Sequence, residues 1–173
     1  MRCDLDIGER AQQAFRVGVP RALEKAVRYR LLNEPSEAES ICLDALEVDS
    51  DNQEAITTLL LALTDQFDDG QTTVRRALET LSRLSNEYER RYYAGLIHER
   101  RAKAVLKNRA PRGGSRAYEW LRDAMTWYER AEAIRPENND DAVLRWNACA
   151  RLIMSDSHLA PGVEEPHEPL LSE

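Results

Sequence analysis

The sequence has few of the residues on which several protein classes depend. Its three cysteines, at positions 3, 42 and 149, are odd in number and far apart, which argues against a disulfide framework or a zinc site. Only seven glycines and seven prolines occur, and β-branched residues are scarce, so sandwiches, barrels and Rossmann-type sheets are disfavoured. The longest apolar run, Leu59 to Leu63, is far shorter than the roughly 20 residues of a membrane-spanning helix. The N-terminus lacks the apolar stretch of a secretory signal, so we expect a cytoplasmic protein with no membrane partner.

Residues that favour helices are abundant instead. Ala, Leu, Glu and Arg dominate the composition, and 42% hydrophobic content is too high for a fully disordered chain. Prolines and short polar clusters separate stretches in which apolar residues recur with helical spacing. These stretches predict helices at 20–33, 36–48, 53–66, 73–85, 87–108, 116–135 and 139–155.

The same punctuation divides the chain into three parts. We predict a helical N-terminal segment at 1–18, with a weak helix at 4–16, and a helical domain at 19–155. Residues 156–173 are predicted to be a disordered acidic tail, because they are rich in proline and glutamate. Ser36 followed three residues later by Glu39 predicts a capping box at the start of the second helix of the domain.

One pattern of residue sizes occurs twice in the domain. A small residue is followed at +4, +7 and +12 by a larger residue, a small residue and a turn residue. The copies are Ala38, Cys42, Ala45 and Ser50, and then Ala124, Tyr128, Ala131 and Pro136. Each copy is preceded by a matching first-helix pattern, Ala26 with Tyr29 and Gly95 with His98. Small residues at these positions let neighbouring helices approach closely.

This pattern resembles the tetratricopeptide repeat (TPR), a helix-turn-helix unit of about 34 residues. The resemblance implies an all-α fold, an α-solenoid of about three TPR-like repeats followed by a C-terminal capping helix at 139–155. Repeats are expected at 19–52, from about 53, and at 88–138. The second copy departs from the family because Leu60 replaces a small residue, and the third contains a long insertion. An unrelated helical bundle with closely packed alanines is the alternative.

The resemblance also implies a function. In TPR stacks the first helix of each repeat lines a groove, which assigns to it Leu23, Val27, Arg30, Thr57, Leu61, Thr64, Tyr92, Leu96 and Glu99. Such a surface suits an amphipathic helix or an extended apolar peptide, as in a non-catalytic protein–protein interaction adaptor or scaffold. The carboxylate clamp of some TPR co-chaperones is missing, but a secretion-type chaperone is an alternative. The same residues would otherwise pack against 1–18 or close a homo-oligomer. The sequence does not identify the partner.

Charge is concentrated in the third copy. Residues 83–122 contain eleven Arg or Lys and four acidic residues, a net charge of +7, whereas the whole chain carries −7. We predict a basic helical hairpin with the cations Lys103, Lys107, Arg109, Arg112 and Arg116. It would be a solvated surface, a docking site for an acidic protein or for the chain's own tail, or an anion- or nucleic-acid-binding module. Nucleic acid ranks last because the chain is acidic and has no base-reading motif.

No pattern of catalytic residues occurs. His98 lacks the second histidine of a zinc-protease motif, and His158 and His167 fall in the predicted tail. Gly113-Gly114 is not followed by the Lys-Ser/Thr of a phosphate loop, and no nucleophile motif is present. We therefore predict that the protein is not an enzyme and has no catalytic residue, metal site or cofactor.

Overall fold

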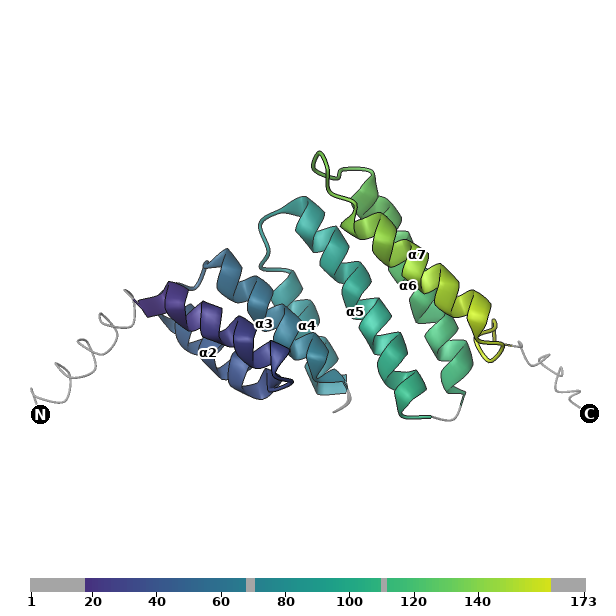
Figure 1. Ribbon diagram of the computed structural model, residues 1–173, viewed down its shortest axis with the longest axis horizontal. Coiled ribbons are helices and arrows are strands. Elements are labelled where there is room, and N and C mark those ends of the chain that lie inside the picture. Colours follow the sequence, from purple (N-terminus) through teal and green to yellow (C-terminus); the bar gives the residue numbers. More distant parts are fainter. Residues whose placement is uncertain (1–17, 68–70, 110–111, 163–173) are drawn as a thin grey trace, which may run out of the picture.

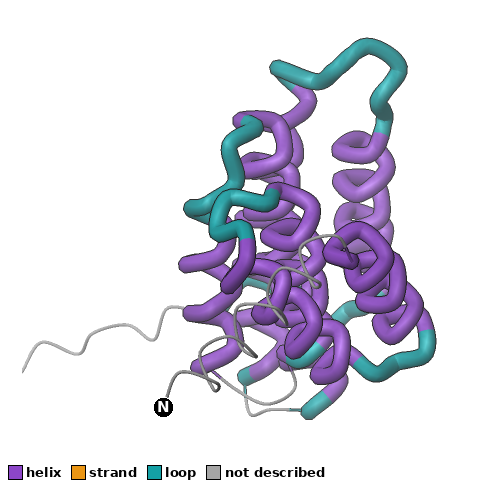
Figure 2. The backbone as a smooth tube through the Cα atoms, turned by 90° about the vertical axis from the view of Figure 1, so that its left-hand side faces the viewer, coloured by secondary structure: helices purple, strands orange, loops and turns teal. Residues whose placement is uncertain are grey.

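The computed structural model describes residues 18–67, 71–109 and 112–162. These residues form helices and loops without a strand (Figure 2), which confirms the all-α prediction. A first helix covers residues 18–31. It is followed by α2 (Pro35–Val48), α3 (Gln53–Asp65), α4 (Gln71–Leu81), α5 (Glu87–Lys107), α6 (Gly113–Glu132) and α7 (Asp141–Ser155). No helix in these ranges combines the length and apolar character needed to cross a membrane.

Helices that follow one another in the sequence also lie side by side. From α2 to α7 each helix packs against the next, and α3 also contacts α5. The chain therefore proceeds from the first helix at one side of the molecule to α7 at the other (Figure 1). Because α5 and α6 have 21 and 20 residues, they are the longest pair and share the most extensive interface.

Two apolar clusters stabilise this arrangement. The first joins the helices from residue 18 to residue 84 around Leu23, Ile56 and Leu60, and it includes Ile97 of α5. The second joins α5, α6 and α7 around Leu121 and Tyr128. Helix α5 thus contributes to both clusters and connects the two halves of the molecule.

Local signals explain three of the helix starts. The Asn52 side chain accepts a hydrogen bond from the Ala55 N–H (2.9 Å), and Asn86 accepts one from Glu89 (3.1 Å), so both cap the helices that follow. The predicted capping box is wrong. Helix α2 starts at Pro35, which has no N–H to satisfy at this position. Glu39 instead accepts hydrogen bonds from two distant side chains, Gln66 (2.8 Å) and Arg76.

The C-terminal boundary of the packed region lies beyond the predicted one. Residues 156–162 belong to the predicted tail, but Leu159 is buried in the second cluster. A Cβ atom added to Gly114 would lie only 2.3 Å from the backbone oxygen of His158. The close crossing explains why glycine occupies the first turn of α6, which we expected to be a loop. The predicted helix at 4–16 and the tail beyond 162 lie outside the described residues.

Candidate functional site

The structure separates the nine predicted groove residues by their exposure. Four of them are buried, and their exposures are 0% for Leu23, 3% for Thr64, 1% for Leu96 and 1% for Glu99. For Leu23, Leu96 and Glu99 the assignment to a ligand-contacting surface is corrected, because neighbouring helices cover these side chains, whereas Thr64 still lines the depression described below. The other five remain accessible: Val27 is 41% exposed, and Arg30, Thr57, Leu61 and Tyr92 are half-buried. The accessible part of the predicted groove therefore keeps the aliphatic residues Val27 and Leu61 and loses Leu23 and Leu96.

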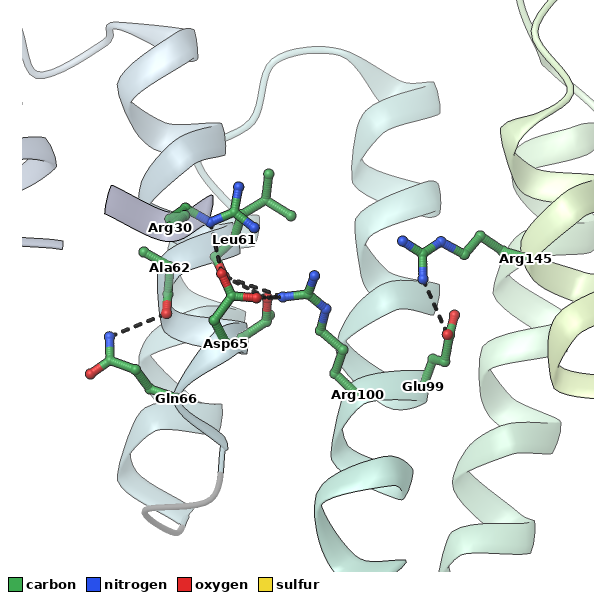
Figure 3. Close-up of polar contacts among 9 residues, drawn as sticks. Arg30, Leu61, Ala62, Asp65, Gln66, Glu99, Arg100 and Arg145 are labelled. Atoms are coloured by element: carbon green, nitrogen blue, oxygen red, sulfur yellow. Dashed lines mark hydrogen bonds and ion pairs between the residues drawn. The ribbon is translucent and has the colours of Figure 1, made fainter. Parts of the chain in front are cut away.

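Charged side chains join the first helix, α3 and α5 (Figure 3). Asp65, at the C-terminal end of α3, accepts a hydrogen bond from Arg30 Nε at 2.8 Å and forms an ion pair with Arg100 of α5. Arg100 also donates to Thr64 Oγ1 at 2.7 Å. One carboxylate thus holds two guanidinium groups from different helices, which fixes the spacing between α3 and α5.

Replacing Asp65 by asparagine should lower the free energy of unfolding by about 1 kcal/mol. The substitution removes the negative charge with which Arg30 and Arg100 both form partly buried ion pairs. Urea denaturation measures this effect. The matched control is Glu79→Gln, whose carboxylate lies 3.8 Å from Arg75 in an exposed pair. This control should change stability by less than about 0.5 kcal/mol. Equal effects of the two substitutions would contradict the bridging role of Asp65.

A second charge cluster surrounds Glu99, one residue before Arg100. Its carboxylate accepts hydrogen bonds from Tyr128 (2.7 Å), Lys103 (2.6 Å) and Arg145 (3.2 Å). Burial favours the protonated form of Glu99, but the hydrogen bonds from Lys103 and Tyr128 and the nearby positive charges outweigh it, so the pKa is lowered. Glu99 is thus an ionised core residue that ties α5 to α6 and α7.

An open depression of about 230 Å³ lies between the C-terminal ends of α3 and α5. Its walls are formed by Thr64, Asp65, Phe67, Arg100, Lys103, Ala104 and Lys107. Three of these side chains are cationic and one is acidic. Arg100 and Lys103 are held in place by Asp65 and Glu99, so their positions are set before a ligand arrives. The depression suits an anionic group together with a short apolar contact.

The predicted basic hairpin forms the joined ends of α5 and α6. Lys103 pairs with Glu99 but is exposed, and Lys107, Arg109, Arg112 and Arg116 are exposed as well. The Arg116 guanidinium lies 5.6 Å from the centre of the Trp120 ring, and Arg101 approaches the same ring at 3.9 Å. This end of the molecule is therefore positively charged, and the Trp120 ring holds Arg101 and Arg116 by cation–π contacts.

A second depression, of about 380 Å³, lies between α4, α5 and α6. It is lined by Leu78, His98 and Trp127 among others, and burial lowers the pKa of His98, whose Nδ1 has no hydrogen-bond partner among the described residues. In the described ranges, no three His, Cys, Asp or Glu side chains gather as metal ligands do.

Arg30, Lys103 and Lys107 were predicted as site residues from the sequence, but other charged residues of the two clusters were not. Asp65, Arg100 and Arg145 were not among the predicted groove residues. A signal was present, because Arg30, Asp65 and Arg100 are each separated by 35 residues, close to the length of the predicted repeat. The alternating charges at this spacing form ion pairs that join the first helix, α3 and α5.

The fold and these surfaces define an all-helical protein of consecutively packed helices with a charged depression. No protein-family model matches the sequence, and the searches of curated proteins and of solved structures returned no significant match.

Proposed function

We propose that the protein is a non-catalytic adaptor that binds an acidic segment of a partner protein in the depression between α3 and α5. The resemblance to TPR proteins supports a recognition function, since repeats of that family present such surfaces. The observation that carries the proposal is the set of three cations, Arg100, Lys103 and Lys107, around one open depression.

The chemistry of the accessible residues favours an acidic partner over the apolar peptide expected from the sequence. The apolar residues Leu23 and Leu96 are buried, whereas Val27 and Leu61 remain accessible, and the Leu61 carbonyl accepts a hydrogen bond from Arg100 at 3.4 Å. A bound segment would therefore place a carboxylate in the depression and an apolar side chain one turn away along α3. Cations at such a surface also accelerate encounter with an acidic partner.

Two matched pairs of variants test this site. A partner captured by the full-length protein is identified, and its acidic segment is synthesised and titrated by calorimetry. Lys107→Glu and Leu61→Glu should each weaken binding by about tenfold, or about 1.4 kcal/mol. Lys107 lines the depression and Leu61 lies one turn before Asp65, so both substitutions place a negative charge near the bound segment. Lys25→Glu and Leu78→Glu, at exposed positions elsewhere, should leave the affinity unchanged.

Other outcomes identify other sites. A loss of binding in Leu78→Glu but not in Leu61→Glu would move the ligand to the depression between α4, α5 and α6. A loss in Lys107→Glu alone, with affinity that falls steeply as salt rises, would favour the second candidate. That candidate is an anion- or nucleic-acid-binding module at the basic ends of α5 and α6. It is supported by the four exposed cations at these helix ends.

A further inference from the structure

The described chain ends beside the basic surface. After α7, residues 156–162 turn back over the first turn of α6, where Leu159 is buried and the His158 carbonyl crosses Gly114. Gly162 then lies next to Ser115, since a Cβ added to this glycine would be 3.8 Å from the Ser115 Cβ. The segment that follows therefore starts within one helical turn of Arg112 and Arg116.

The charges of this segment and of the surface are opposite and equal in number. Residues 163–173 contain Glu164, Glu165, Glu168 and Glu173 and no Lys or Arg. Residues 107–116 contain four cations and no acidic residue. The four cations, Lys107, Arg109, Arg112 and Arg116, are all exposed.

We propose that this basic surface is a docking site for the chain's own acidic segment 163–173. Glu164 and Glu165 follow Gly162 by two and three residues, which at about 3.3 Å per residue places their carboxylates within reach of Arg112 and Arg116. The remaining residues are long enough to bring Glu168 and Glu173 to Lys107 and Arg109. Because the segment is tethered beside its site, its effective concentration there is in the millimolar range, and weak ion pairs suffice to hold it.

The docked segment would act as an internal competitor. Lys107 belongs both to the basic surface and to the wall of the depression between α3 and α5. An acidic ligand from outside would therefore have to displace the segment before it reaches Lys107. The inference does not need the proposed function, because it concerns only contacts within one chain.

Carbodiimide cross-linking provides a direct test, because the chain has only three lysines, Lys25, Lys103 and Lys107. In the full-length protein at low salt, peptides from 163–173 should be joined to Lys107 or Lys103 and not to Lys25, which lies on the exposed face of the first helix. The cross-links should disappear in 0.5 M salt and in a variant whose four segment glutamates are replaced by glutamine. A mixture of ¹⁴N- and ¹⁵N-labelled chains separates links within one chain from links between two chains.

Three results would overturn the proposal: no cross-link from this segment, equal cross-linking to Lys25 and Lys107, or links only between chains. The last result would assign the segment to a second copy of the protein.

Binding of a probe gives an independent measurement. A fluorescein-labelled decaglutamate should bind the four-glutamine variant at least about fivefold more tightly than the unchanged chain, because its internal competitor is lost. Arg109→Gln/Arg112→Gln in the four-glutamine background should abolish this gain. Equal affinities of the unchanged chain and the four-glutamine variant would contradict docking. Arg109 and Arg112 do not line the α3–α5 depression, so the double variant separates binding at the basic surface from binding in the depression.

Discussion

Replacement of Glu99 by alanine is expected to lower the free energy of unfolding by about 3 kcal/mol. The side chain is 1% exposed, and its carboxylate accepts hydrogen bonds from Tyr128 and Lys103 and pairs with Arg145. Lys103 can turn to solvent after the substitution, but the buried Tyr128 hydroxyl loses its acceptor and Arg145 keeps a charge without its partner. Chemical denaturation followed by circular dichroism measures the change.

A smaller substitution in the same cluster provides the comparison. Tyr128→Phe removes one donor but leaves Glu99 with both cations, so we expect a loss of about 1 kcal/mol. If both variants lost the same stability, the Tyr128 hydrogen bond alone would explain the effect, and the ionic role of Glu99 would be rejected.

The ionisation of Glu99 also predicts a pH dependence. Because the pKa of Glu99 in the folded protein is below its usual value of 4.5, the carboxylate stabilises the fold fully above that pH. This contribution is lost as the pH falls below 4.5 and through the lowered pKa. Denaturation measured across this range should give a smaller pH slope for Glu99→Gln than for the unchanged chain. An identical slope would show that Glu99 does not titrate in this window.

Replacement of Gly95 by alanine should destabilise the protein by about 2 kcal/mol, although alanine favours helices by about 1 kcal/mol. An added Cβ would lie 2.6 Å from Cε1 and 2.8 Å from Cδ1 of Tyr128. That ring is fully buried, its hydroxyl is bonded to Glu99, and the Tyr92 ring lies 5.8 Å away between centroids. To make room for the added Cβ, either the ring must shift and weaken its hydrogen bond to Glu99 or α5 and α6 must separate.

The chain offers a matched control for this substitution. Gly18 lies in the first helix, and a Cβ added to it would have no atom within 4 Å, so Gly18→Ala should stabilise by about 0.5–1 kcal/mol. Urea titrations of the two variants should therefore shift in opposite directions. A stabilising effect of Gly95→Ala would show that α5 and α6 are not held at the distance that the structure indicates.

Helix positions could be predicted from the sequence because their signals are local. The helix predicted at 53–66 is observed at Gln53–Asp65, and the one predicted at 87–108 is observed at Glu87–Lys107. Asn52 and Asn86 mark these starts through their own side-chain hydrogen bonds. The prediction failed at α6, whose first turn contains Gly113 and Gly114, because the contact that permits these glycines comes from His158.

The candidate site was predictable only in part. Arg30 and Leu61 were predicted to be groove residues, and both side chains are half-buried and therefore accessible. Leu23 and Leu96 were predicted from the sequence to lie in the same groove, yet neighbouring helices bury them. Helical periodicity identifies a face, but not how far an adjacent helix covers it.

The sequence by itself determined that this protein is helical, where most helices begin and end, and that its positive charge is concentrated around α5 and the start of α6. Only the tertiary structure decided that Glu99 is a buried anion, that Arg30 and Arg100 share Asp65, and that residues 156–162 end beside Ser115. The physical reason is distance along the chain. Capping and helix propensity depend on residues a few positions apart, whereas burial and ion pairing depend on helices whose separation no local pattern specifies.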